Sequence, residues 1–373
     1  MNRKEVYTIS IANYKFNRIV NSIAGLLKEW SYKYSIRKKM DFKKFKRDRT
    51  YHQAITRYYR QYGLKKVDCY WHDLCKDFNG LASEKYIPDY IYHRYIEPKF
   101  NKIIMAHAYS DKNTYQRFED LVRIPKALIY NMNGIFYNGC HQEISRAQAI
   151  QIIKNMDQDY LIKPSIDSGG GKNIALLSNK NGELFVDRQK KSIEDLLKQY
   201  HMDYSIQEIY KQVDYLSRVN PNAMNSIRVY TMRMDDKILY MDSYIRFGIN
   251  DALVDNTVSG GVFCRIESDG NLSKEAYDGK YRAYEEHPQS KIKFQAIKIT
   301  QFDQIKEKAQ LMHKKLPHFK FVSWDLGIDE HEEICLIEVN LKHQNIIAFQ
   351  LLNGPVFGDY TDQILKETFH AKA

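Results

Sequence analysis

Three consecutive glycines at 169–171 are the feature that most constrains the fold, because they separate two short apolar runs in DYLIKPSIDSGGGKNIALL. Glycine loses more backbone entropy on ordering than any other residue, so this cluster indicates a loop whose backbone approaches something closely. Successive glycine N–H groups can curl around an anion, and phosphate is the usual one. The lysine-containing phosphate loop is excluded, since that pattern places Lys-Ser or Lys-Thr before a helix. Here Lys172 is followed by Asn173 and a strand-like IALLS, which predicts a flap over phosphates or a tight hairpin without a ligand.

Three oxygen-bearing side chains form a second pattern, in SWDLGIDEHEEICLIEVN. Glu338 and Asn340 are two residues apart on a predicted strand, so both project from one face. Asp325 ends the preceding predicted strand, and a hairpin would bring its carboxylate to the same face. Such oxygens suit Mg²⁺, which also binds nucleotide phosphates. The alternative is that Glu338 and Asn340 are ordinary solvated strand residues.

The order of the predicted elements favours an α+β fold. Residues 1–100 read as mostly helical, whereas Asn133-Gly134 predicts a β-hairpin. SRAQAIQIIKNM has helical spacing, and SIEDLLKQYH opens like a helix capping box. Beyond residue 203 short strands and turns predominate, interrupted by the helix DQIKEKAQLMHKKL. Strands in blocks joined by hairpins argue against a doubly wound parallel sheet.

Basic residues concentrate early in the chain. Lys and Arg number 57 against 46 Asp and Glu, a formal net charge of +11, and YKYSIRKKMDFKKFKRDRTYHQAITRYYRQYGLKK is especially rich in them. This stretch predicts either a surface for a polyanion or anionic lipid, or a solvated helical face. Since no recognised nucleic-acid motif accompanies the charge, we expect no nucleic-acid partner.

Hydrophobic patterning predicts a cytoplasmic protein. No apolar run approaches the ~18 residues of a membrane span, and polar residues interrupt any signal-peptide core near the start. Peripheral attachment at the inner face of a membrane, through the basic stretch, is the alternative.

Taken together, these segments resemble the ATP-grasp superfamily. YLIKPSIDSGGGKNIALL, SIQEIY, NSIRVYT and WD…LIEVN are similar in order and spacing to its amino-acid and peptide ligases. The strongest likeness is to the sugar-transfer-associated ATP-grasp group, found with genes for bacterial surface polysaccharides. The resemblance implies an ATP-grasp fold, with two α+β subdomains clamping ATP and a mostly helical N-terminal extension. The corresponding segments are residues 1–100, 101–205 (with the flap) and 206–373 (with the metal-binding strands).

The resemblance also implies roles for individual residues. Lys112 and Lys163 match two nucleotide lysines, and Arg228 matches an arginine that steadies the γ-phosphate or acyl-phosphate; Arg228, Lys163 and Glu338 form the implied catalytic set. Asp325, Glu338 and Asn340 match magnesium ligands, with Glu338 bridging two ions and Mn²⁺ as the alternative metal. The implied nucleotide site also includes a flap, a hinge that reads adenine with Glu208 as its polar anchor, and a ribose contact. The flap is Ser168, Gly169, Gly170 and Gly171, the hinge is Gln207, Glu208, Ile209 and Tyr210, and the ribose contact is Asp214.

The implied activity is that of an ATP-dependent carboxylate–amine ligase. A carboxylate would attack the γ-phosphorus of ATP, and an amine would then displace phosphate from the acyl-phosphate. The gene association implies a sugar or uronic-acid precursor of capsule or O-antigen. Arg233, Arg246 and Arg265 lie on predicted strands and are candidates either for holding such an anion or for ordinary surface charge.

The implied partners are ATP, an anionic small-molecule or sugar carboxylate and an amine acceptor, with a membrane surface or glycosyltransferase for the N-terminal region. Two other functions stay open. One is a kinase that phosphorylates a small molecule or sugar, and the other is a non-catalytic nucleotide-binding module that docks on a membrane or polyanion.

Overall fold

The computed structural model describes residues 34, 48–166, 171, 173–180, 182–250, 255 and 260–370. The chain divides into two compact units, one comprising Met1–Lys99 and Asn345–Ala373 and the other Phe100–Gln344. Apart from Tyr34, the basic stretch before residue 48 lies outside the described residues, so its contact with a membrane or glycosyltransferase stays a prediction. None of the helices in the described ranges has both the length and the apolarity needed to cross a bilayer.

The first unit is built from helices. Asp48 begins the first of them by accepting a hydrogen bond from the Tyr51 N–H at 3.0 Å, as N-cap residues do. The C-terminal helices belong to this unit, because the Gln350 side chain bonds both the N–H and the C=O of Ile87, at 2.7 and 2.9 Å. The predicted helical character of residues 1–100 is confirmed for the described residues 48–100. The elements are α2 (Arg49–Arg60), α3 (Tyr70–Asn79), α4 (Asp89–Ile91), η2 (Tyr92–Ile96), α5 (Glu97–Phe100), α11 (Ile346–Asn353), η6 (Gly358–Tyr360) and α12 (Thr361–Phe369).

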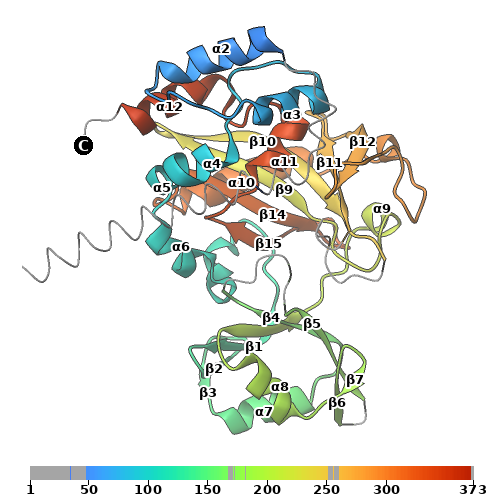
Figure 1. The fold of residues 1–373 in the computed structure, drawn as a ribbon. Coiled ribbons are helices and arrows are strands. Elements are labelled where there is room, and N and C mark those ends of the chain that lie inside the picture. Colours follow the sequence, from blue (N-terminus) through green and yellow to red (C-terminus); the bar gives the residue numbers. More distant parts are fainter. Residues whose placement is uncertain are drawn as a thin grey trace, which may run out of the picture. The chain divides into compact units, whose positions relative to one another are not determined.

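The second unit contains two antiparallel sheets (Figure 1). The seven-stranded sheet has the order β13-β12-β11-β10-β9-β14-β15. Side chains on one face, such as Val229, Ile245 and Trp324, are buried against Ile305 and Met312 of a helix that packs on this sheet. The other face carries buried aromatic rings, Tyr230, Tyr244 and Phe321, beside its polar groups. Its elements are β9 (Ile227–Met234), β10 (Lys237–Phe247), β11 (Val262–Ile266), β12 (Leu272–Asp278), β13 (Ala283–Tyr284), β14 (Phe321–Ile328), β15 (Ile334–Asn340) and the helix α10 (Phe302–Lys314).

The eight-stranded sheet has the order β3-β2-β1-β8-β4-β5-β6-β7. Two helices cover one face of it (Figure 1), where Ile153 and Leu196 join Ile129, Ile162 and Ile206 in a second core. Strand alternation therefore directs Lys163, which follows Ile162, to the opposite face. The elements are β1 (Ala127–Met132), β2 (Ile135–Asn138), β3 (Glu143–Ile144), β4 (Tyr160–Pro164), β5 (Ala175–Lys180), β6 (Glu183–Val186), β7 (Gln189–Lys190), β8 (Tyr204–Glu208), α7 (Arg146–Lys154) and α8 (Ile193–Tyr200).

Shorter elements complete this unit. Of these, α9 joins the two sheets, α6 and η3 precede β1, and η5 lies between β13 and α10: α6 (Ile103–Ser110), η3 (Lys112–Phe118), α9 (Asp214–Ser217) and η5 (Phe294–Ala296).

Local sequence signals match this architecture closely. Asn133 and Gly134, with φ of 50° and 86°, form the two-residue turn between β1 and β2. Ser192 caps α8 by accepting a hydrogen bond from the Asp195 N–H at 3.0 Å. The predicted α+β class is confirmed. The domain limits inferred from sequence differ from the observed units in two places: β8 crosses the limit after residue 205, and residues 345–373 group with the N-terminal helices.

Candidate functional site

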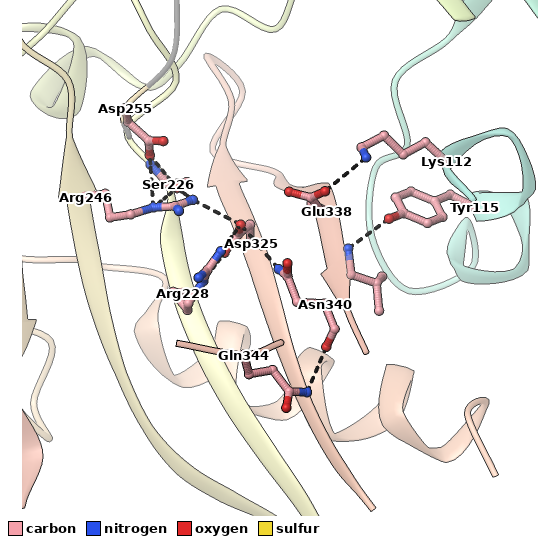
Figure 2. Close-up of polar contacts among 11 residues, drawn as sticks. Lys112, Tyr115, Ser226, Arg228, Arg246, Asp255, Asp325, Glu338, Asn340 and Gln344 are labelled. Carbon is pink, nitrogen blue, oxygen red and sulfur yellow. Dashed lines mark hydrogen bonds and ion pairs between the residues drawn. The ribbon is translucent and has the colours of Figure 1, made fainter. Parts of the chain in front are cut away.

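A β-hairpin brings the three predicted metal ligands together. In the register of β14 and β15, Asp325 lies opposite Glu338, and Ser323 lies opposite Asn340. The Asn340 amide donates to Asp325 Oδ2 at 3.4 Å. The three side chains therefore face the same side of the seven-stranded sheet, opposite the face covered by α10 (Figure 2).

Two arginines from neighbouring strands hold Asp325. Arg228 of β9 lies opposite it in register and donates through Nε and Nη2, at 2.7 and 2.6 Å, to the two carboxylate oxygens. Arg246 of β10 reaches Oδ2 at 3.0 Å. Burial alone would raise the pKa of Asp325, but Arg228 and then Arg246 lower it by more, so the pKa lies well below its usual range. Asp325 is thus an ionised carboxylate in a buried position.

Arg246 is itself fixed by a polar network that sequence reasoning did not find. Its Nε donates to Ser226 Oγ at 3.0 Å, and Asp255 Oδ2 accepts the Ser226 N–H at 2.7 Å (Figure 2). The Arg246 guanidinium consequently lies between two buried carboxylates, Asp255 and Asp325. Of the three arginines considered from the sequence, Arg246 is the one that the structure brings to the cluster of predicted metal ligands.

Arg233 and Arg265 have other partners. Arg233 donates to the backbone carbonyl of His313 at 3.1 Å, on the α10 side of the sheet. Arg265 pairs with Glu267 at 3.6 Å, with both side chains about two-fifths exposed. These two contacts support the surface-charge interpretation for Arg265 and a structural role for Arg233.

Lys112 contacts both Glu338 and the segment that follows β4. Its ammonium lies 3.0 Å from Glu338 Oε1 (Figure 2), and its backbone N–H donates to the Ser165 carbonyl at 3.1 Å, directly after β4. Lys163, the residue before the last of β4, is 8% exposed. Burial and the neighbouring Lys112 lower the pKa of Lys163 to about 7, although Glu338 acts in the opposite direction. An anion bound here would favour the charged form of Lys163.

The tyrosine hydroxyl of Tyr115 supports the strand that carries the ligands. It accepts the Val339 N–H at 2.8 Å, between Glu338 and Asn340, and the ring is 2% exposed. Lys112 and Tyr115 both lie in η3, on either side of a kink at Thr114. No local pattern pointed to Tyr115, because its partner Val339 is 224 residues away along the chain.

We expect Tyr115→Phe to lower the free energy of unfolding by about 1–3 kcal/mol, because the Val339 N–H would be buried without a partner. Urea denaturation measures the change. Tyr109→Phe is the matched control, since that ring packs against His318 and Phe319. Equal midpoints for the two variants would contradict a specific role of the Tyr115 hydroxyl.

The glycine-rich loop joins two paired strands, as predicted. Ile162 of β4 lies opposite Ala175 of β5 in an antiparallel pair. Gly171 has a φ of 71°, a left-handed conformation in which glycine is favoured. The predicted contacts Ser168, Gly169 and Gly170 lie outside the described residues.

The predicted hinge, 207–210, begins in the last two residues of β8, the strand between β1 and β4. Gln207 is buried in this sheet, whereas Ile209 is 39% exposed just beyond it. Glu208 Oε1 accepts the Lys126 N–H at 3.0 Å, which fixes the carboxylate at the end of the strand. Tyr210 packs under the guanidinium of Arg123, 5.0 Å from its ring centre. Asp214 is not brought to the others: it begins α9 and pairs with Arg218, with both side chains about 70% exposed.

The donor set fits a magnesium ion. Asp325, Glu338 and Asn340 offer oxygen atoms only, and their cationic neighbours are Arg228, Arg246 and Lys112. Oxygen ligands with few protein carboxylates are typical of Mg²⁺, which keeps waters and phosphate oxygens in its shell. Within the described ranges, Glu338 Oε2 accepts no hydrogen bond, so one carboxylate oxygen is available as a ligand.

Comparison with known families gives one match over most of the chain. The family model described as sugar-transfer associated ATP-grasp matches residues 91–366. No curated protein matches the chain.

Solved structures of low sequence identity align with part of the chain. The biotin carboxylase domain of 2-oxoglutarate carboxylase from Hydrogenobacter thermophilus aligns with a TM-score of 0.40 and 12% identity, over 73% of this chain and 47% of that one. D-alanine–D-alanine ligase from Helicobacter pylori aligns with a TM-score of 0.40 and 11% identity, over 72% and 60%. VanG D-Ala:D-Ser ligase from Enterococcus faecalis aligns with a TM-score of 0.37 and 14% identity, over 70% and 61%. This chain therefore spans less than two thirds of the length of each of these proteins.

Proposed function

Because the chain belongs to the sugar-transfer associated ATP-grasp family, we propose that it is an ATP-dependent ligase that activates a carboxylate as an acyl-phosphate and couples it to an amine. One observation carries the proposal. Lys112 bonds the carbonyl of Ser165 at the base of the glycine-rich loop and pairs with Glu338 in the ligand hairpin. The segment that leads into the loop expected to cover phosphates and the carboxylate expected to hold a metal thus both contact Lys112, the first through its backbone N–H and the second through its ammonium.

The nucleotide would lie between these elements. Lys112 and Lys163 would neutralise phosphate charge, and the 168–171 loop would cover the phosphates with its backbone N–H groups. Adenine would be read at 207–210, with Glu208 as the polar anchor. Asp214 stays a prediction for the ribose, since its exposed pairing with Arg218 adds no support.

Asp325, Glu338 and Asn340 would hold magnesium. When bound, the ion supplies positive charge that stabilises the transferring phosphoryl group. A second ion bridged by Glu338 is part of the same proposal, as is Mn²⁺ as the alternative metal. The protein's own cations act beside it, because Arg228 and Arg246 already lie against Asp325.

The reaction would proceed in two balanced steps. A carboxylate oxygen of the substrate forms a bond to the γ-phosphorus as the bond to the β–γ bridging oxygen breaks, which releases ADP. The amine nitrogen then bonds to the acyl carbon, phosphate leaves with the electron pair, and the amine loses a proton to water. Arg228 and Lys163 would hold the phosphoryl oxygens during both steps, and such preorganised charges commonly contribute a factor of ~100 to ~1,000 in rate.

We further propose that the activated acid is a sugar carboxylate, such as a uronic acid, in the synthesis of a surface polysaccharide such as capsule or O-antigen. Arg246 supports an anionic substrate, because its guanidinium is fixed next to the ligand cluster and its side chain is 14% exposed. The sequence LKHQNIIAFQ after Asn340 also departs from the small glycine-containing turn of the dipeptide ligases, which argues for a different acceptor.

Trapping with hydroxylamine tests the proposal. The protein is incubated with ATP, Mg²⁺ and a panel of uronic acids, and ADP and hydroxamate are measured. We expect ADP release that depends on the acid, with hydroxamate in equal amount, because hydroxylamine intercepts acyl-phosphates. A phosphorylated sugar that is stable to hydroxylamine would instead identify a kinase. Nucleotide binding without turnover for any acid would favour the non-catalytic alternative.

A further inference from the structure

Arg123, in the segment before β1, links the proposed adenine hinge to the hairpin that carries the ligands. Its Nη2 lies 3.3 Å from Glu208 Oε1, and its Nη1 donates to Asp329 Oδ2. Its guanidinium also covers the ring of Tyr210 at 5.0 Å. The function proposed above uses none of these contacts.

The hairpin end of this link is rigid. Asp329 is fully buried in the β14–β15 turn, and its Oδ1 accepts the N–H groups of His331 and Glu333 at 2.9 and 2.8 Å. The Arg123 backbone also pairs with β15, with its N–H bonded to the Ile334 carbonyl at 2.9 Å. The guanidinium is therefore positioned from the side of the seven-stranded sheet, not by the hinge.

The hinge end leaves one oxygen available. The Lys126 N–H and the Arg123 guanidinium both bond Oε1 of Glu208, at 3.0 and 3.3 Å. Across the described ranges no donor reaches Oε2, and the side chain is 18% exposed. A carboxylate held in this way is an acceptor with a fixed direction, and in its ionised form it cannot donate.

Such an acceptor distinguishes the purine bases. Adenine carries an amino donor at the position where a 6-oxo purine carries a carbonyl acceptor. A site built to bond a donor rejects the analogue that lacks it, because a polar group is then left unpaired. The rejection requires that the carboxylate cannot rotate away, and both the Lys126 N–H and the Arg123 guanidinium oppose that rotation.

We infer that Arg123 is a positioning residue that holds the free oxygen of Glu208 in place and so sets the preference of the nucleotide site for 6-amino over 6-oxo purines. The inference rests on the proposed ATP site and extends it to the origin of base specificity. It also means that the base is read by a group anchored on the same hairpin as the metal ligands.

The test measures the dissociation constants of ADP and of inosine diphosphate, with Mg²⁺, by calorimetry. Inosine diphosphate differs from ADP by the 6-oxo group and the proton on N1. The ratio is the dissociation constant of inosine diphosphate divided by that of ADP. In Arg123→Met we expect this ratio to fall by about tenfold, since one hydrogen bond to a charged group is lost. Arg146→Met is the matched control, because Arg146 of α7 pairs with the exposed Glu194 of α8; its ratio should equal that of the wild type.

Further variants keep the inference falsifiable. Arg123→Lys retains a charge for Asp329 but lacks the fork that reaches both carboxylates, so it too should lose preference, and it serves if Arg123→Met does not fold. In a Glu208→Gln background, changing Arg123 should have no further effect on the ratio.

Three results would overturn the inference. The first is a ratio unchanged from the wild type in Arg123→Met or Arg123→Lys, whether or not both constants rise together. The second is an undiminished effect of changing Arg123 in the Glu208→Gln background. The third is a wild-type protein that binds neither nucleotide, and this result alone also overturns the proposed ATP site.

Discussion

Replacing Glu338 with alanine is expected to abolish detectable ATP turnover while leaving the fold intact. Glu338 is a proposed ligand of the metal and is the partner of Lys112, at 3.0 Å. Its loss would remove a ligand and leave Lys112 close to the buried Lys163 without an intervening negative charge. Losing one preorganised charged contact commonly lowers the rate by a factor of ~100 to ~1,000, and loss of metal binding adds to this. ADP release at saturating Mg²⁺ measures the effect.

Glu333→Ala is the control for this prediction. Glu333 lies in the same hairpin, its side chain is exposed, and its backbone N–H rather than its carboxylate closes the turn onto Asp329. A binding measurement adds a second readout, since Mg²⁺ should tighten ADP binding by the wild type and by Glu333→Ala but not by Glu338→Ala. Near-normal turnover of Glu338→Ala would count against the metal assignment.

Replacing Arg228 with methionine is expected to destabilise the protein by about 3–5 kcal/mol, because it leaves a buried carboxylate without its main partner. Asp325 is 2% exposed, and both of its oxygens are bonded by Arg228, at 2.7 and 2.6 Å. Arg246 contacts only Oδ2 and is shared with Ser226 and Asp255, so it compensates in part. The urea midpoint of unfolding measures the loss.

Two further variants separate charge from packing. Arg228→Met combined with Asp325→Asn should recover much of the lost stability, because the unpaired negative charge is then absent. Arg265→Met, which breaks an ion pair about two-fifths exposed, should change the free energy of unfolding by less than about 1 kcal/mol. A loss in Arg228→Met no larger than that in Arg265→Met would refute the buried ion pair as a stabilising feature.

Local patterns predicted much of the architecture. The Asn133-Gly134 turn, the cap at Ser192 and the two strands flanking the glycine-rich loop all depend on residues within a few positions of one another. The same holds for Glu338 and Asn340, since alternation along one strand puts both on one face. Short-range backbone geometry is encoded by neighbouring residues, and it could therefore be predicted from the sequence.

Domain limits were harder to predict. The helices of 346–369 group with the N-terminal unit through contacts such as that of Gln350 with Ile87, which are far apart in sequence. A limit placed after residue 205 also cut β8, because nothing local to SIQEIY says which sheet it joins. Partners in a sheet depend on the whole arrangement of strands.

The chain's own order of residues was enough to determine its α+β class, its hairpins and the identities of the oxygen-bearing side chains at 325, 338 and 340. Only the tertiary structure decided which charges surround two of these side chains: Arg228 and Arg246 for Asp325, and Lys112 for Glu338. It likewise decided that Arg123 pairs with Glu208. The physical reason is that an ion pair needs a few ångströms of separation in space but places no limit on separation along the chain. Lys112 and Glu338 are 226 residues apart, and only the folding of both sheets brings them within 3.0 Å.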